Sequence, residues 1–421
     1  MHHLKPLKLL SLFSAVLAIG NCAAGNIDQP QIKDAVDNAI KPLIQQYNIP
    51  GLAIAVTING EHYFYHYGVA SKQTKQPITN ETLFEIGSLS KTFTATLASY
   101  AQVNGSLSLA DSASKYLPSL RGSSFDNISL LNLGTHTAGG LPLQVPDNIN
   151  NTDQLMAYFK QWQPTHAAGA YRRYSNPSIG MLGMITAKSM HRSFEDALEK
   201  KLFPELGMPH SYINVPAAQI KNYAQGYTKT DVPVRLNAGV LASEAYGIKT
   251  NAVDLIRFID ANMQVVTLDG KLQHAITDTH TGYFSAGEVT QDLIWEQYAY
   301  PIALKQVLAG NADGMIYQDT IATKLSPPLQ PQADVLINKT GSTNGFAAYA
   351  AFIPVQKMGI VILANKSIPI APRVTAAYQI LTRLDHLAAA KNQSSSPLYT
   401  FLSLKISIIE IFKNRYEKIF F

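Results

Sequence analysis

A serine and a lysine three residues apart, Ser88 and Lys91 in the stretch FEIGSLSKTFTA, are the residue types of a nucleophile and its proton acceptor. A serine hydroxyl needs an adjacent base, and a neutral lysine can serve if burial and neighbouring positive charge lower its pKa. The apolar residues after Lys91 recur at helical spacing, which predicts Ser88 at or near a helix N-terminus with Lys91 one turn later on the same face. The positive end of that helix dipole would favour a developing anion beside Ser88.

The spacing alone is not specific, because the chain has a second match, Ser112 and Lys115 in LADSASKYLPSL. There Asp111 is expected to cap a short helix that Pro118 ends. We interpret this second pair as structural, so the first pair must be tested by what surrounds it.

A second candidate proton carrier lies in YRRYSNPSIGMLG, where Tyr174 and Asn176 precede a helix that begins near Pro177. A similar Y-x-N triplet at residues 212–214 has no following helix and is set aside. Taken singly, a tyrosine is more often a packed aromatic, and an asparagine before proline is a common turn residue. The triplet therefore gains meaning only in combination with other groups.

A third element, Lys339-Thr340-Gly341, ends the predicted strand DVLINKTG. Gly341 permits close approach of another backbone or a ligand to the strand edge, and Lys339 offers a positive charge for a substrate carboxylate. The triplet at residues 280–282, His-Thr-Gly, resembles it, but HAITDTHTGYF is not predicted to be a strand of the same sheet and is set aside.

The elements that must position these residues come from both ends of the chain. Two β-rich runs joined by Asn59-Gly60 predict a hairpin, and three further runs between residues 334 and 366 predict an antiparallel meander. A helix is predicted before the hairpin and another after the meander. The expected fold is α/β (α+β): one antiparallel sheet of five or more strands, flanked by terminal helices.

The long middle of the chain is rich in helical patterns and predicts a large helical lobe inserted between hairpin and meander. We expect a single catalytic domain over residues 25–390, with a sheet lobe from about 25–87 and 310–390 and the helical lobe over about 88–309. Chemistry is expected in the cleft between the two lobes.

Composition describes a globular protein: 46% of the 421 residues are hydrophobic and 15% are charged, which excludes general disorder. Of the formal charge of +5, the first 24 residues and residues 391–421 together account for all of it. The body of the chain is therefore close to neutral, which argues against nucleic-acid binding.

Residues 1–24 have the order of a secretory signal peptide, with Lys5 and Lys8 before a short apolar run and small residues at the end. We expect cleavage after Ala24 and a secreted mature protein. Cys22, the only cysteine, would be removed, which leaves no disulfide or thiolate ligand. A lipoprotein reading of Cys22 is disfavoured by the preceding Asn21.

No cofactor or metal is implied. The histidines form no H-x-E-x-H or H-x-H-x-D cluster, and no phosphate-binding G-x-x-x-x-G-K-[ST] loop is present. Residues 391–421 differ in composition from the rest and are expected to be an atypical C-terminal extension that begins with the linker KNQSSSP.

Three ordered elements, S-x-x-K, Y-x-N and K-T-G, coincide by chance far less often than any one of them, and S-x-x-K and K-T-G are active-site motifs of serine β-lactamases and penicillin-binding proteins. The chain resembles a class C β-lactamase, a periplasmic cephalosporinase, in GSLSKTFTA, YSNPSIG, KTGSTNGF and LANKSIPIAPRVTAAYQIL. HTAGGLPLQVP and EAYGIKT extend the resemblance, which runs from about Ile32 to about Leu384.

The resemblance implies hydrolysis of cephalosporins and penicillins through an acyl-enzyme on Ser88, with Lys91 and Tyr174 as the proton-transfer pair. The backbone N–H groups of Ser88 and Ser342 would form the oxyanion hole. The remaining implied site residues are Lys339 and Thr340 facing the substrate carboxylate, Gly341 beside them, Gln144 and Asn176 as donors to the side-chain amide, Tyr246 in the side-chain pocket, and Arg373 beside the carboxylate-binding end.

Two positions depart from the family pattern: Ile370 stands where many members have asparagine, and His136 where many have tyrosine. Fine substrate preference is therefore left open, and His136 is given no role. The resemblance also implies a monomer that acts on small β-lactams without an obligate protein partner. Alternatives are a D-alanyl-D-alanine peptidase, a related serine esterase, and a β-lactam sensor that stays acylated.

Overall fold

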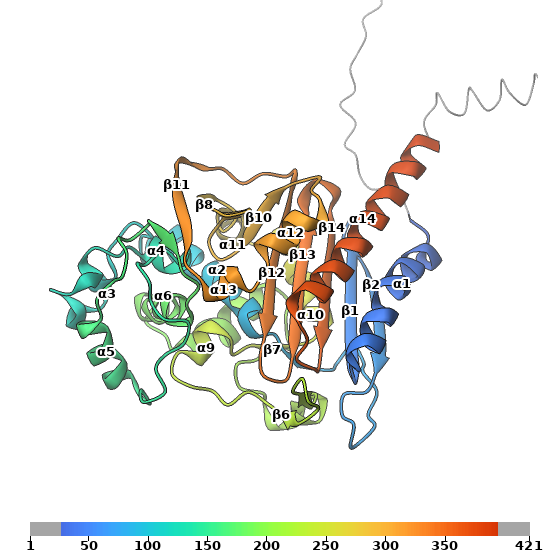
Figure 1. Ribbon diagram of the computed structural model, residues 1–421, viewed down its shortest axis with the longest axis horizontal. Coiled ribbons are helices and arrows are strands. Elements are labelled where there is room, and N and C mark those ends of the chain that lie inside the picture. Colours follow the sequence, from blue (N-terminus) through green and yellow to red (C-terminus); the bar gives the residue numbers. More distant parts are fainter. Residues whose placement is uncertain (1–26, 395–421) are drawn as a thin grey trace, which may run out of the picture.

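A ten-stranded antiparallel sheet runs through the protein (Figure 1). The computed structural model describes residues 27–394. In spatial order the strands are β2 (Glu61–Gly68), β1 (Gly51–Ile58), β14 (Met358–Ala364), β13 (Ala347–Ile353), β12 (Val335–Ser342), β10 (Glu296–Ala299), β9 (Val289–Gln291), β8 (Gly282–Ala286), β11 (Thr320–Leu329) and β4 (Tyr171–Arg172).

The predicted hairpin is confirmed by β1 and β2, which pair with Ile58 opposite Glu61. The two residues between them, Asn59 and Gly60, have φ angles of 53° and 83°. Two consecutive residues with positive φ match the twist of the flanking strands, which is why Asn-Gly is favoured in such turns.

The predicted meander is also confirmed, because β12, β13 and β14 are consecutive neighbours in the sheet. β14 then pairs with β1, for example Ile54 with Ile362, so strands from the two ends of the chain lie side by side. The sheet built from both chain ends thus has the five neighbouring strands expected from the sequence.

The predicted range of the helical lobe, about residues 88–309, is wrong in one respect. β4, β8, β9 and β10 fall within residues 88–309 yet belong to the sheet, each with only two to five residues. Runs this short carry little period-two signal, so the sequence did not reveal them. Gly282 begins β8, so the reason for setting aside residues 280–282 is wrong as well. His280 itself lies before the strand, is buried, and contacts Asn262 Oδ1 through Nε2 at 2.8 Å.

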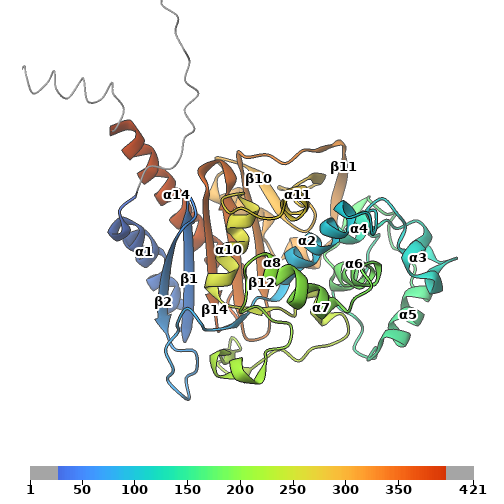
Figure 2. The ribbon, with the colours of Figure 1, turned by 180° about the vertical axis from the view of Figure 1, so that it is seen from behind.

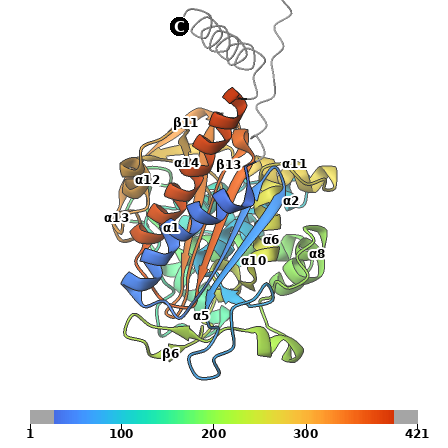
Figure 3. The same ribbon diagram turned by 90° about the vertical axis from the view of Figure 1, so that its right-hand side faces the viewer.

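Helices cover both faces of the sheet, with α1 (Gln29–Tyr47) and α14 (Ile370–Ser394) on one face (Figure 3) and α2 (Ser90–Val103) and α10 (Ala252–Asn262) on the other (Figure 2). β1 is buried throughout, and its residues alternate between the two layers. Leu52 and Ile54 belong to the α1 and α14 layer, and Ala53 to the other.

The helical lobe has a core of its own, which includes Phe125, Phe159 and Leu182. It lies beside the end of the sheet away from α1 (Figure 1). The other helices are α3 (Ala113–Tyr116), α4 (Leu130–Gly134), α5 (Thr152–Gln161), α6 (Asn176–Ser189), α7 (Phe194–Ala197), α8 (Phe203–Glu205), α9 (Ala242–Ala245), α11 (Gly270–Asp278), α12 (Leu304–Gly310) and α13 (Gly314–Tyr317). Two small two-stranded sheets pair β3 (Phe84–Glu85) with β7 (Lys249–Thr250) and β5 (Gly226–Tyr227) with β6 (Pro233–Val234).

The closing helix extends further than expected. α14 continues to Ser394, so the linker does not begin at Lys391, whose Nζ instead lies 2.9 Å from Asp28 Oδ1. The signal peptide expected over residues 1–24 and most of the C-terminal extension lie outside the described residues. Within residues 27–394, no helix is both long enough and apolar enough to cross a bilayer.

Candidate active site

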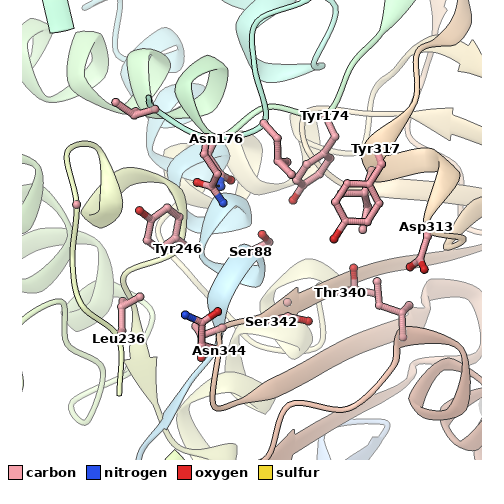
Figure 4. A pocket seen from close by; sticks show the side chains of 18 of the residues that line it. Ser88, Tyr174, Asn176, Leu236, Tyr246, Asp313, Tyr317, Thr340, Ser342 and Asn344 are labelled. Atoms are coloured by element: carbon pink, nitrogen blue, oxygen red, sulfur yellow. The ribbon is translucent and has the colours of Figure 1, made fainter. Parts of the chain in front are cut away.

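A cavity of about 800 Å³ lies where the sheet meets the helical lobe. Figure 4 shows Ser88 near its centre, with Tyr174 and Asn176 on one side and Thr340 and Ser342 on the other. The residues that the three motifs singled out are thus brought together from α2, α6 and β12. The expected position of the cleft between sheet and helices agrees with this arrangement.

Ser88 lies in a 3₁₀ turn, Gly87–Leu89, that leads directly into α2, as its predicted place near a helix N-terminus requires. Gly87 has φ +50°, and a Cβ there would lie 2.6 Å from Ser342 N. A Cβ on Gly341 would overlap the carbonyl oxygen of Ile86. Both glycines are therefore needed for the end of β12 to lie against the Ser88 turn.

Lys91 is fully buried beneath Ser88, one turn into α2. Its Nζ donates to Ser88 Oγ at 2.8 Å and to the carbonyl oxygen of Ala245 at 2.9 Å. Burial, opposed by Tyr174 and reinforced by the charge of Lys339, lowers the pKa of Lys91 to about 8. A substantial neutral fraction near neutral pH makes this amine able to accept a proton.

Tyr174 is buried just before α6 and lines the cavity beside Ser88. The Nζ atoms of Lys91 and Lys339 lie 5.2 and 5.1 Å from the centre of its ring. Burial alone would raise the pKa of the phenol, but the charges of Lys339 and Lys91 outweigh it and lower the pKa to about 8. Lys91 and Tyr174 therefore titrate as a coupled pair around Ser88.

Lys339, Thr340 and Gly341 end β12 as predicted, with Lys339 only 2% exposed and Thr340 lining the cavity. Lys339 reaches toward Tyr174 from β12, and its Nζ lies 5.1 Å from the centre of the Tyr174 ring. A buried ammonium at this point attracts an anionic group of a bound molecule and also favours the phenolate of Tyr174.

Asn176 and Gln144 line the cavity but bond to each other, since Asn176 Nδ2 donates to Gln144 Oε1 at 2.9 Å. Within the described residues, Asn176 Oδ1 has no hydrogen-bond partner. Asn176 and Gln144 are thus neighbours at the wall of the cavity, and their expected role as donors to a substrate amide stays a prediction. Tyr246, at the end of α9, lines the same side of the cavity (Figure 4).

Arg373 lies next to the end of β12 that carries Lys339 and Thr340, the carboxylate-binding end expected from the sequence, but it does not itself line the cavity. It is fully buried in α14, behind the end of β12, where it donates to Gly341 O at 3.0 Å and to Ser342 Oγ at 2.7 Å. Ile370, one turn earlier in α14, is the residue of that helix that reaches the cavity.

A buried ion pair that the sequence motifs did not predict lies beneath Tyr174. Arg172 donates to Glu296 Oε1 at 2.6 Å, and its guanidinium carbon lies 5.6 Å from the centre of the Tyr174 ring. The proximity of Arg172 to Tyr174 in YRRYSNP could have indicated one partner. Glu296 belongs to the unrecognised β10 and had no signal. The cavity residues Leu236, Asp313, Tyr317 and Asn344 (Figure 4) lie outside the motifs.

His136, to which the sequence assigned no role, stacks on Tyr174 with ring centroids 4.3 Å apart. Its Nδ1 accepts from the backbone N–H of Ser175 at 3.3 Å. Burial, together with the charges of Arg172, Lys91 and Lys339, lowers the pKa of His136 well below its ordinary value. The ring is neutral and adds no further positive charge beside Tyr174.

The second serine-lysine pair is far from this arrangement. Ser112, rather than Asp111, occupies the N-cap position of α3, while Asp111 accepts from Lys115 Nζ at 2.7 Å and from Tyr116 OH at 2.6 Å. The pair is structural, as expected, although the predicted capping residue is off by one. Across residues 27–394, no group of three or more His, Cys, Asp or Glu side chains is arranged to hold a metal ion.

Comparison with known proteins gives a consistent result. The family model described as Beta-lactamase matches residues 36–384. A β-lactamase from Providencia stuartii is 51% identical over 350 residues, which cover 83% of this chain and 91% of that protein. A solved class C β-lactamase in complex with cefoxitin is 59% identical, with a TM-score of 0.83, over 85% of this chain and 99% of that one. A solved D-alanine carboxypeptidase from Burkholderia cenocepacia is 53% identical, with a TM-score of 0.81, over 84% of this chain and 99% of that one.

Proposed function

The chain belongs to the β-lactamase family, with the sequence and fold of its class C members, which are serine hydrolases that open β-lactams through an acyl-enzyme. From this premise we propose that Ser88 is the nucleophile and that Lys91 and Tyr174 carry its proton. One observation supports this most strongly: Lys91 Nζ lies 2.8 Å from Ser88 Oγ in a buried site that lowers the pKa of both Lys91 and Tyr174 to about 8.

In the first step, Ser88 Oγ bonds to the β-lactam carbonyl carbon while its proton passes to the Lys91–Tyr174 pair. The carbonyl oxygen takes up negative charge beside the N–H groups of Ser88 and Ser342. Single oxyanion-hole donors of this kind are worth roughly 3–4 kcal/mol of transition-state stabilisation. The C–N bond of the ring then breaks, and the ring nitrogen takes a proton from the pair.

In the second step, water attacks the ester carbonyl and gives its proton to the same pair. The bond between that carbon and Ser88 Oγ breaks, and Ser88 recovers its proton. Lys339 and Thr340 at the end of β12 would bind the substrate carboxylate. Asn176, Gln144 and Tyr246 would contact its amide side chain.

The test is hydrolysis of a chromogenic cephalosporin by the purified protein and by its Ser88→Ala variant. The proposal expects many turnovers per wild-type molecule and none for the variant. Acylation of one equivalent without further turnover would contradict it and would favour a β-lactam sensor.

A second candidate function is D-alanyl-D-alanine carboxypeptidase activity, favoured by the 53% identical solved protein that is named a D-alanine carboxypeptidase. The same nucleophile and oxyanion hole would serve both reactions. Release of D-alanine from a peptide ending in D-alanyl-D-alanine would be measured beside cephalosporin hydrolysis. A higher kcat/KM for the peptide would make the carboxypeptidase the main activity.

The cellular location is part of the proposal: removal of residues 1–24 would release a monomeric mature protein into the periplasm, without an obligate partner. Cell fractionation and N-terminal sequencing of the mature chain would test the location, and sedimentation would test the monomer. Truncation after Ala390 is expected to preserve activity, although it removes the last turn of α14 and the contact between Lys391 and Asp28.

A further inference from the structure

Arg373 is a buried guanidinium whose hydrogen bonds go to one short piece of backbone and one hydroxyl. It donates to Gly341 O at 3.0 Å and to Ser342 Oγ at 2.7 Å, and its Nε has no partner within the described residues. Among residues 27–394, the hydrogen bonds of Arg373 go to a backbone carbonyl and a hydroxyl, and none goes to a carboxylate. A buried charge without a counterion is costly and is ordinarily paired, so its retention calls for a reason.

The guanidinium remains charged where it lies. Burial lowers the pKa of Arg373 to about 10, with a smaller opposing effect of Tyr349. At neutral pH the group is therefore a cation behind the end of β12. The full positive charge acts on the carbonyl group to which it donates.

The carbonyl of Gly341 and the N–H of Ser342 belong to the same peptide group. In a trans peptide these two bonds point in opposite directions. Thr343 N donates to Phe346 O at 3.0 Å, across to the β13 side. Because N–H groups alternate between the two edges of a strand, the N–H of Ser342 points away from β13. The Ser88 turn lies on that side, as the close approach between Gly87 and Ser342 N requires.

We propose that Arg373 is a positioning residue for the oxyanion hole, which polarises and orients the Gly341–Ser342 peptide so that the Ser342 N–H is a stronger donor. Donation to a carbonyl oxygen increases the partial positive charge on the N–H of the same peptide, which is the cooperativity seen in chains of hydrogen bonds. The inference rests on the proposed function, in which that N–H holds the oxyanion.

A direct contact between Arg373 and the substrate carboxylate fits the structure less well. Arg373 is fully buried and does not line the cavity, whereas Ile370 of the same helix does. The two roles have different consequences. A carboxylate contact affects only substrates that carry the carboxylate, whereas a polarised oxyanion-hole donor affects every substrate with a carbonyl group.

The most direct readout is the infrared stretching frequency of the ester carbonyl in the acyl-enzyme formed with cefoxitin. Stronger hydrogen bonds in the oxyanion hole weaken the C=O bond and lower this frequency. Arg373→Met is expected to shift the band to higher frequency, and Arg373→Lys, which keeps a charge, is expected to shift it less. A band at the wild-type frequency in Arg373→Met would overturn the proposal.

Kinetics with a matched substrate pair separates the two roles. A chromogenic cephalosporin and its methyl ester, which lacks the charged carboxylate, would be compared. For both, Arg373→Met is expected to lower kcat about tenfold with little change in KM, less than the about 10²–10³ lost with a whole oxyanion-hole donor. A rise in KM for the acid alone would assign Arg373 to carboxylate binding and overturn the proposal.

The matched control is Arg383→Met, which removes an exposed arginine of the same helix and is expected to change neither the band nor kcat. All rates would be divided by the fraction of molecules that become acylated, so that misfolded protein does not enter the comparison. If the wild type itself forms no acyl-enzyme, the proposed function fails. If it forms one and Arg373→Met leaves the band unchanged, this inference alone fails.

Discussion

Ser88–Lys91 and Ser112–Lys115 have the same spacing and both lie at the start of a helix, yet their lysines are in opposite environments. Lys91 is fully buried and lies between the Ser88 hydroxyl and a backbone carbonyl, with two further titratable groups nearby. Lys115 has a side chain 59% exposed and bonds to Asp111. Burial lowers the pKa of Lys91 to about 8, whereas the bond to Asp111 raises the pKa of Lys115.

The three-residue spacing places a lysine close to a serine in both pairs. The surrounding residues decide whether that lysine can accept the serine proton. At the first pair, the sheet brings Lys339 and the loop before α6 brings Tyr174, both far away in the sequence. At the second pair, the contacts of Lys115 come from within its own short helix region. A local motif becomes a site only where distant elements converge on it.

The largest expected effect separates the two serines. Ser88→Ala is expected to lower kcat for a chromogenic cephalosporin by about 10⁴-fold or more, as loss of the nucleophile does in other serine hydrolases. Ser112→Ala, the matched control, should retain the wild-type rate. Equal losses in the two variants would remove the distinction between the pairs.

Replacing each lysine by arginine sharpens the comparison. A guanidinium stays protonated at any working pH and cannot accept the serine proton. Lys91→Arg is therefore expected to lose about 10²–10⁴-fold in kcat/KM, the range of general base catalysis. Lys115→Arg keeps its ion pair with Asp111 and should be indistinguishable from the wild type in the same assay.

The contact between β12 and the Ser88 turn can be broken without touching either motif lysine. Gly341→Ala adds a Cβ that overlaps the carbonyl oxygen of Ile86, so β12 must move and carry the Ser342 N–H with it. We expect a loss of about 10²–10³ in kcat, comparable to removal of an oxyanion-hole donor. Gly270→Ala, where the added Cβ would meet no atom within 4 Å, is the control and should be fully active.

The pH dependence tests the coupling of Lys91 and Tyr174. When both are protonated the site has no base, so kcat/KM should fall as the pH drops below their first shared pKa. The phenolate of Tyr174 raises the pKa of Lys91, but it exists only after the pair has lost its first proton. In Tyr174→Phe, Lys91 alone can lose that first proton, so the rate should fall and the acidic limb of the profile should stay in place or move to higher pH. A limb that moves to lower pH would contradict the coupling.

The smallest effect concerns stability at the second pair. Lys115→Ala removes an exposed ion pair with Asp111, and such pairs contribute little because water and salt screen them. The midpoint of thermal unfolding should stay within about 2 °C of the wild type. A larger drop in this midpoint would show that the ion pair stabilises the fold more than exposed pairs usually do.

Local sequence signals predicted the parts of the fold that have strong local preferences. Asn59-Gly60 identified the hairpin, and the long β-rich runs identified β12, β13 and β14. The strands β8, β9 and β10 escaped because they are short and their partners lie elsewhere in the chain. A run of three to five residues is too short to show the alternation of apolar and polar residues by which a strand is recognised.

The motifs predicted the central residues of the candidate site but not the residues around them. Ser88, Lys91, Tyr174 and Lys339 meet as expected, but the pairing of Arg172 with Glu296 and the stacking of His136 on Tyr174 depend on elements whose contacts no motif specifies. The bonds of Arg373 to Gly341 and Ser342 depend on how α14 packs against the sheet. Only the packed structure contains that information.

The central claim is that the chain is acylated at Ser88 and then releases the acyl group. The most direct test is to quench the protein during turnover of cefoxitin and to map the adduct by mass spectrometry of its peptides. The account predicts the adduct on the peptide that contains Ser88, with decay to unmodified enzyme once the drug is consumed. An adduct on the peptide that contains Ser112, or one on Ser88 that persists indefinitely, would contradict it.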